Sequence, residues 1–207
     1  KIISHKTPPM EVMQSVTALM TYLHKLVFAK EQSPTDDLLG RQIQKHRDEG
    51  TYSRDDLVSM AFLLLIAGHE TTANMISLST LVLLQNPEKL AAIQQDPTKT
   101  LGAVEELLRY FTIAESALGR VAKEDVEIGG VLIRAGEGVL TLANTGNRDP
   151  EVFKNADELD LERGARNHLS FGFGPHQCLG QNLARLELQI VIDTLFKRIP
   201  GLRPAVP

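Results

Sequence analysis

Several features that would point to a particular class of protein are scarce or missing in this sequence. Its 207 residues include one cysteine and no tryptophan, and the formal net charge is −4. A single cysteine excludes an internal disulfide and favours a reducing compartment, so we expect a cytoplasmic protein. The small acidic excess offers no basic field to attract nucleic acid. With 43% hydrophobic and 23% charged residues, the composition is that of an ordinary globular protein.

Long apolar runs are also missing. The longest, residues 60–67, is followed at once by glycine, histidine and glutamate. It is too short to span a bilayer and is better interpreted as the middle of a buried helix. No secretory signal is visible. The chain begins at Lys1 without methionine and stops abruptly at Pro207, so we expect it to be a piece of a longer protein.

The first half of the sequence carries the signals of helices. Prolines and capping residues that begin helices lie at Thr7-Pro8-Pro9, at Ser33-Pro34 with Asp36, at Ser53 with Asp56, and at Asn86-Pro87. The longest periodic apolar stretch, residues 57–84, would form a helix roughly 40 Å long. A further helix is expected over about residues 101–111.

The second half has a different texture. Apolar residues alternate with charged residues before Gly129-Gly130, and a second apolar run follows to residue 133. This pattern predicts a β-hairpin over residues 126–133, and residues 139–143 predict another short strand. Residues 145–170 show no regular pattern. A glycine-rich loop then leads into a helix with Leu183, Leu186 and Ile190 on one apolar face. We therefore predict a mainly α fold with a small antiparallel β part.

The glycine-rich loop holds the only cysteine. Residues 171–180 read FGFGPHQCLG, and Cys178 lies where the loop becomes a helix. The free N–H groups and positive dipole at a helix start favour thiolate over thiol. A thiolate ligand donates electron density to haem iron and favours O–O cleavage. The alternatives are a buried, inert cysteine, a zinc site with His168 and His176 that would lack a fourth ligand, and a nucleophile for which no base is signalled.

The whole loop resembles the haem-binding loop of the cytochrome P450 family. The resemblance includes its glycines and the Ala184-Arg185 pair that follows Cys178 at the family's usual spacing. It implies haem b (iron protoporphyrin IX) as the cofactor, with Cys178 as the metal ligand. It also implies cofactor contacts from Phe171, Gly172 and Gly180.

A polar segment, AGHETT at residues 67–72, interrupts the longest apolar helix. Glycine inside a helix costs about 1 kcal/mol relative to alanine, and threonines that bond back to carbonyls invite a local kink or a widened turn. A core helix with satisfied polar groups would explain the segment equally well. The segment is also similar to the family's small-Gly-x-acid-Thr motif above the haem. This implies that Thr71 hydrogen-bonds dioxygen, that Glu70 helps to deliver protons, and that Ala67 leaves room for both cofactor and substrate.

Glu106 and Arg109 lie one turn apart on the helix expected at residues 101–111. Such a pair on a surface would contribute only a few tenths of a kcal/mol. In order along the chain, it matches the family's Glu-x-x-Arg motif. The resemblance implies a buried, structural pair with Arg163 as its partner in the irregular segment.

Other residues are assigned through the resemblance alone. Arg120 and His176 would bind the haem propionates, because arginine matches a carboxylate with a bidentate fork. Asn147-Arg148-Asp149-Pro150 is similar to a family element after the sheet. The substrate-pocket positions would be Leu63, Ile66, Ala67, Ser116, Ala117 and Leu118.

The resemblance implies that residues 1–207 are the carboxy-terminal part of a single cytochrome P450 domain, without the amino-terminal half and the final β-hairpin. The expected activity is haem-thiolate monooxygenation, which inserts one oxygen atom of O₂ into a small organic substrate. Electrons would come from a ferredoxin with its reductase, docked near His176, Gln177 and Arg185. Alternatives are nitric oxide reduction, peroxygenation, or a non-catalytic binding fragment. Glu70 and Thr71 argue against these alternatives, and we expect no nucleic-acid partner and no membrane span.

Overall fold

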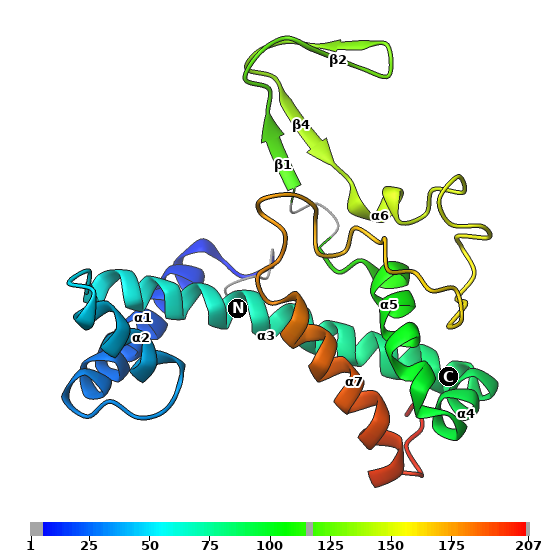
Figure 1. Cartoon of the computed structure of the whole chain (residues 1–207), viewed down its shortest axis with the longest axis horizontal. Helices are drawn as coiled ribbons and strands as arrows, with labels where there is room; N and C mark the ends of the chain where they lie inside the picture. Colours follow the sequence, from blue (N-terminus) through cyan, green and yellow to red (C-terminus); the bar gives the residue numbers. More distant parts are fainter. Residues whose placement is uncertain (1–5, 115–117, 206–207) are drawn as a thin grey trace. The chain divides into compact units, whose positions relative to one another are not determined.

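A computed structural model describes residues 6–114 and 118–205 (Figure 1). Helices make up most of the regular structure, and the strands are short and antiparallel. The predicted fold class is therefore confirmed. The chain divides into two compact units, residues 1–69 and 70–207, with the boundary inside the longest helix.

The first unit consists of three helical segments: α1 (Pro9–Gln32), α2 (Leu38–Asp48) and the beginning of α3 (Arg54–Gln85). Its core is formed by five buried aliphatic side chains from these segments: Leu23, Val27, Ile43, Leu57 and Val58. The beginning of α1 at the predicted prolines is confirmed, because Pro9 occupies the first helical position. The beginning of α3 is also confirmed, because Ser53 Oγ accepts the Asp56 N–H at 3.3 Å.

The beginning of α2 differs from the sequence prediction. Ser33-Pro34 with Asp36 was expected to open it, but Asp37 is the cap and accepts the Gly40 N–H at 2.9 Å. A Cβ on Gly40 would lie 1.9 Å from the Thr35 carbonyl oxygen. The chain before α2 therefore folds tightly over the first turn of the helix, and this delays its start.

Helix α3 is continuous from Arg54 to Gln85. It stays α-helical through residues 67–72, so the predicted widened turn is not formed. A Cβ added to Gly68 would meet nothing within 4 Å. Among the described residues, close packing does not require this glycine.

The second unit contains the rest of α3 followed by helices α4 (Pro87–Gln95), η1 (Pro97–Lys99), α5 (Thr100–Phe111), α6 (Ala143–Gly146) and α7 (Gln181–Arg198). Helices α5 and α7 pack against each other. The core is formed by Met75, Leu83, Ile93, Ala103, Val104, Leu107, Leu108, Leu188, Ile192 and Phe196. Helix α5 is central to this core, because it is buried over residues 103–109.

The buried face of α7 is not the predicted one. Leu188 and Ile192 lie in the core, whereas Leu183, Leu186 and Ile190 are exposed. Helix α7 has apolar residues on more than one face, so periodicity alone could not decide which of them packs against α5.

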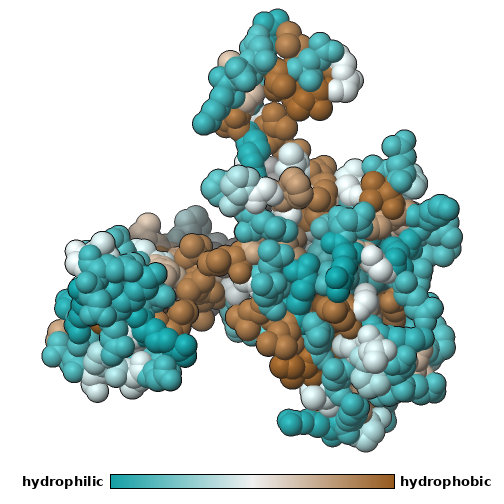
Figure 2. Space-filling model, viewed as in Figure 1, coloured by the Kyte–Doolittle hydropathy of each residue, from teal (hydrophilic) through white to brown (hydrophobic). Residues whose placement is uncertain are grey.

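The β part consists of two separate antiparallel pairs (Figure 1). One pairs β2 (Val126–Ile128) with β3 (Val131–Ile133), which confirms the predicted hairpin. Gly129 and Gly130 both have positive φ, as a two-residue hairpin turn requires. The exposed apolar side chains of these strands are brown at the top of Figure 2: Val126, Ile128, Val131 and Leu132.

The other pair joins β4 (Gly138–Thr141) to β1 (Leu118–Val121), a strand that was not predicted. The strand predicted at residues 139–143 ends at Thr141, and Ala143 begins α6. From residue 147 to residue 180 the chain has no regular element, which agrees with the prediction for residues 145–170 except that residues 145 and 146 belong to α6. No helix in the described part of the chain has the length and apolarity needed to cross a membrane.

Candidate functional site

The cysteine loop, residues 171–180, is closed by its own backbone. The Cys178 N–H donates to the Phe171 carbonyl at 2.9 Å, and the Gln177 N–H donates to the Gly174 carbonyl at 3.0 Å. Gly172 and Gly174 have φ values of 71° and 87°, a region that favours glycine. These glycines therefore let the chain turn back tightly enough to hold Cys178 next to the first residue of the loop.

Cys178 is a free, exposed thiol three residues before the first residue of α7. The N-cap, Gly180, has no side chain to satisfy the first N–H groups of the helix, so the positive end of α7 remains open near the sulfur. Two neighbours in the loop are strongly exposed apolar side chains, Phe173 at 85% and Leu179 at 89%. An accessible thiol at a helix start, flanked by apolar surface, fits the axial ligand of a haem.

Several of the other residues predicted to contact haem or substrate are exposed or lie outside the described part of the chain. His176 is exposed in the cysteine loop. Arg120 is exposed on β1, and its guanidinium donates to the carbonyl of Gly119 at 2.9 Å. Ser116 and Ala117 lie outside the described residues.

The polar segment of α3 presents both predicted proton-transfer groups to solvent. Glu70 and Thr71 are consecutive, exposed residues of the second unit. Asn74 Nδ2, one turn later, donates to Glu70 Oε1 at 3.5 Å. In the first unit, Leu63 and Ala67 are exposed and Ile66 is half-buried.

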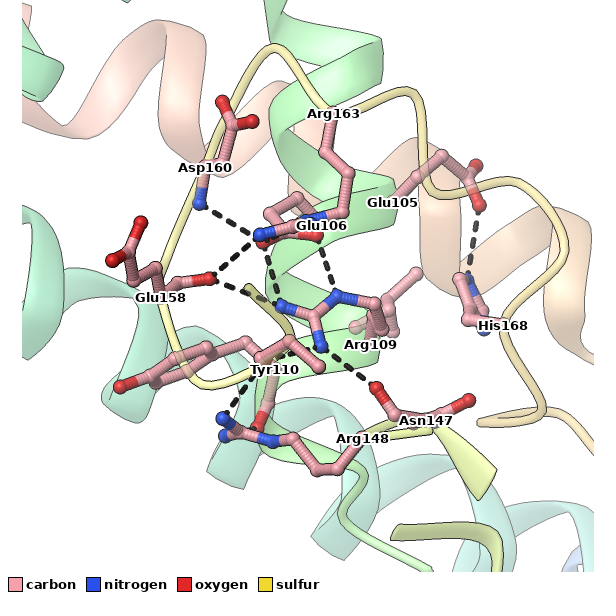
Figure 3. Close-up of polar contacts among 12 residues, drawn as sticks. Glu105, Glu106, Arg109, Tyr110, Asn147, Arg148, Glu158, Asp160, Arg163 and His168 are labelled. Carbon is pink, nitrogen blue, oxygen red and sulfur yellow. Dashed lines mark hydrogen bonds and ion pairs between the residues drawn. The ribbon is translucent and has the colours of Figure 1, made fainter. Parts of the chain in front are cut away.

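The Glu106–Arg109 pair lies on α5 (Figure 3). Both side chains are 0% exposed. Arg109 binds the carboxylate through two nitrogens, Nε at 2.7 Å and Nη2 at 2.8 Å. Its third nitrogen, Nη1, donates to the carbonyls of Asn147 and Ala156 at 2.7 and 2.8 Å. Each hydrogen-bonding nitrogen of this buried guanidinium therefore has an acceptor, which a charged group in a protein core requires.

Arg163 reaches the same carboxylate from the irregular segment. Its Nε donates to Glu106 Oε1 at 3.1 Å, and the Asp160 N–H donates to that oxygen at 2.9 Å. The structure thus brings together the three residues that were assigned a structural role. Together they attach residues 147–163 to α5.

A second carboxylate on α5, Glu105, was not predicted to have a role. It accepts His168 Nε2 at 3.0 Å (Figure 3) and binds Arg185 through Nε at 2.6 Å and Nη2 at 3.1 Å. Burial raises the pKa of Glu105, but the hydrogen bonds from His168 and Arg185 and the charge of Arg185 outweigh it and lower the pKa to about 2. The Arg185 side chain remains 21% exposed beside this contact, so its assignment to a ferredoxin-docking surface stays a prediction.

A neutral hydrogen-bond network lies beside these ion pairs. Asn147 Nδ2 donates to Thr112 Oγ1 at 2.8 Å and to Ser170 Oγ at 3.0 Å, and Asn147 Oδ1 accepts the Leu169 N–H at 2.6 Å. Ser170 Oγ in turn donates to the Leu108 carbonyl at 2.8 Å. The sequence element that begins at Asn147 therefore helps to hold the chain just before the cysteine loop.

The zinc alternative is not supported. Within the described residues, no group of three or more histidine, cysteine, aspartate or glutamate side chains could hold a metal ion. His168, one of the three ligands considered, is buried against Glu105 instead.

Comparisons with known proteins agree with this geometry. The family model for cytochrome P450 matches residues 11–199. Cytochrome P450-SU2 of Streptomyces griseolus is 50% identical over 206 residues, which cover 100% of this chain and 50% of that protein. The chain spans about half the length of the curated relatives it matches.

Solved structures give the same result. Cytochrome P450 MoxA of Nonomuraea recticatena (CYP105) has a TM-score of 0.92 and 59% identity, covering 98% of this chain and 50% of its own. The mycinamicin VIII C21 methyl hydroxylase MycCI of Micromonospora griseorubida, bound to mycinamicin VIII, has a TM-score of 0.90 and 43% identity, covering 95% and 50%. The chain therefore belongs to the cytochrome P450 family and is similar to its bacterial members.

Proposed function

We propose that the protein carrying this chain is a haem-thiolate monooxygenase that hydroxylates a small organic substrate. The observation that carries the proposal is Cys178, a free and exposed thiol between a glycine-rich loop and the start of α7. Family membership supports haem b as the cofactor, and the similar protein MycCI is described as a methyl hydroxylase. The identity of the substrate does not follow from these residues.

Bound haem would supply the iron that binds dioxygen, and thiolate ligation favours O–O cleavage. This chain would supply the ligand sulfur and the groups that move protons. Thr71 and Glu70 are adjacent on α3, and a threonine hydroxyl beside a carboxylate can relay protons from water. The Asn74 amide, one turn later on α3, donates to Glu70 Oε1.

Binding and structural roles complete the proposal. Arg120 and His176 bind the haem propionates, while Phe171, Gly172 and Gly180 form the loop around the ligand. Leu63, Ile66, Ala67, Ser116 and Ala117 contribute to the substrate pocket. Glu106, Arg109 and Arg163 hold the irregular segment on α5. The electron donor is a ferredoxin that docks near His176, Gln177 and Arg185.

The ligand assignment is tested by Cys178→Ser in the haem-loaded protein. We expect the thiolate-type Soret band of the reduced carbon-monoxide complex to disappear, because a serine hydroxyl does not provide the same ligand field. Gln177→Ala is the matched control, since it changes an exposed neighbour in the same loop and keeps the sulfur. An unchanged band in Cys178→Ser would contradict the assignment.

The reaction class needs a separate test. Turnover under isotopically labelled O₂ should place one labelled atom in the product and the other in water. Product formation without label would favour peroxygenation or another reaction that does not insert an atom of O₂. Purification of the protein without haem would favour a non-catalytic binding module.

A further inference from the structure

We propose that Glu105 is a positioning residue for Cys178, because its carboxylate ties together the two chain segments that lead into and out of the cysteine loop. The inference rests on the proposed function, in which Cys178 is the haem ligand. His168 lies ten residues before Cys178 and Arg185 seven residues after it. Both bind the same carboxylate on α5.

The segment entering the loop is fixed through His168, which is 7% exposed. Its Nδ1 accepts the Ser170 N–H at 3.2 Å, which assigns the ring proton to Nε2. Nε2 then donates to Glu105 Oε2 at 3.0 Å. The imidazole therefore connects α5 to the backbone immediately before the loop, with a ring orientation fixed at both nitrogens.

The segment leaving the loop is fixed through Arg185, on the second turn of α7. Nε and Nη2 donate to the two carboxylate oxygens of Glu105. A lysine could not form this bidentate contact. Nη1 donates to Gln181 Oε1 at 3.0 Å, on the first residue of the helix. The guanidinium thus holds the start of α7, next to Cys178, against α5.

His168 and Arg185, the two partners of Glu105, both lie close to Phe171, the first residue of the loop. The Arg185 guanidinium lies 4.6 Å from the centroid of the Phe171 ring, and the His168 ring lies 5.7 Å from it. The Phe171 carbonyl accepts the Cys178 N–H. Phe171 therefore contacts both partners of Glu105 and also accepts a hydrogen bond from Cys178.

A purely structural role in joining α5 to α7 does not explain this arrangement. A second link between the same helices already exists, in which Thr100 Oγ1 donates to Asp193 Oδ1 at 2.7 Å. That link involves no residue of the loop or of the segment before it. What Glu105 adds is the connection to residues 168–171, and through them to the surroundings of the sulfur.

Groups outside the direct ligand orient it and tune its donation to a metal. Loss of the Glu105 carboxylate should therefore loosen the loop and weaken the iron–sulfur bond. In the reduced carbon-monoxide complex of Glu105→Gln, we expect the thiolate-ligated form to convert to the form without thiolate ligation. The rate of this conversion should be about tenfold higher than in wild type. The midpoint potential of the haem iron should shift in the same variant.

Asp193→Asn is the matched control, because it removes the other α5–α7 link. Both variants are compared at urea concentrations that give equal free energies of unfolding, so that general destabilisation cancels. The inference predicts faster conversion and a shifted potential in Glu105→Gln but not in Asp193→Asn. Equal conversion rates and potentials in the two variants would overturn it.

His168→Gln is a milder second variant, in case Glu105→Gln does not fold. Its side-chain amide can still donate to Glu105, but it lacks the fixed ring that also accepts the Ser170 N–H. Conversion faster than in Asp193→Asn supports the inference, and conversion at the same rate as in Asp193→Asn overturns it. Absence of the thiolate-type band in wild type would instead contradict the proposed function, so the two failures are distinguishable.

Discussion

The surroundings of α5 and the groups proposed to meet haem and dioxygen are built in opposite ways. On α5, Glu105, Glu106 and Arg109 are buried, and other parts of the chain supply partners for each of them. In contrast, Cys178 and Thr71 are exposed. The charged groups that stabilise this fold and the groups proposed for chemistry are therefore different residues in different places.

This difference has a physical origin. A charge removed from water requires complete pairing, so the α5 carboxylates must find their partners within the folded chain. A ligand sulfur or a proton-transfer hydroxyl must instead remain accessible to the species it binds or exchanges with. Substitutions around α5 should therefore reduce stability, whereas substitutions at the groups proposed for chemistry should reduce activity.

The largest effect is expected for Arg109→Ala. The substitution leaves Glu106 as a buried carboxylate without its main partner, and such a loss costs about 3–5 kcal/mol of unfolding free energy. Urea unfolding followed by circular dichroism measures this change. Arg148→Ala is the control, because Arg148 also donates to the Ala156 carbonyl but is partly exposed. A cost for Arg109→Ala no larger than for Arg148→Ala would contradict the contrast.

Much of this fold follows from local sequence signals. The Gly129-Gly130 hairpin and the start of α3 at Ser53 depend on residues that are close together along the chain, and both are confirmed. The order of the motifs along the chain also indicates the cytochrome P450 family by itself. Local chemistry of this kind can be predicted from sequence, because caps and turns act within a few residues.

Non-local pairings were not predictable in the same way. Strand β1 pairs with β4 about twenty residues later, and its sequence carries no clear alternation. The partners of Glu105 lie 63 and 80 residues away along the chain. Two adjacent glutamates were visible in the sequence, but nothing in their spacing indicated that each would bind a different set of cations.

Thr71→Ala tests the exposed side of the comparison. Loss of a positioned proton-transfer group typically lowers the rate by about 100-fold or more, so hydroxylated product should form roughly 100-fold more slowly. The unfolding free energy of Thr71→Ala is measured beside the rate, so that a loss of activity is separated from a loss of stability. Thr72→Ala, the adjacent threonine, is the control and should retain most of the activity. Equal losses in the two variants would contradict a specific role for Thr71.

The unfolding free energy at acid pH should depend on the titration of Glu105. Its pKa falls from 4.5 to about 2 on folding, so the unfolded chain binds a proton more readily at this residue. The stabilisation is therefore fully present above about pH 4.5 and is lost as the pH falls towards 2. Each pH unit between the two pKa values corresponds to about 1.4 kcal/mol of unfolding free energy.

Glu105→Gln should remove this part of the pH dependence. The unfolding free energy of the variant should fall less steeply than that of wild type between about pH 4.5 and 2. Acid unfolding at several fixed urea concentrations measures the two slopes. Parallel profiles for the two proteins would show that the carboxylate does not titrate as its contacts imply.

The smallest effect is expected for Glu162→Gln, which removes an exposed ion pair with a single cationic partner. Lys99 Nζ lies 2.6 Å from Glu162 Oε1, but the two side chains are 41% and 71% exposed. Water and salt screen such a pair, so the unfolding free energy should fall by less than about 0.5 kcal/mol, and by less still at high salt. Urea unfolding of Glu162→Gln beside Glu106→Gln compares two carboxylates of similar cation distance and opposite burial. A loss for Glu162→Gln that approaches the loss for Glu106→Gln would mean that burial is not what separates the stabilising charges of this fold from its surface charges.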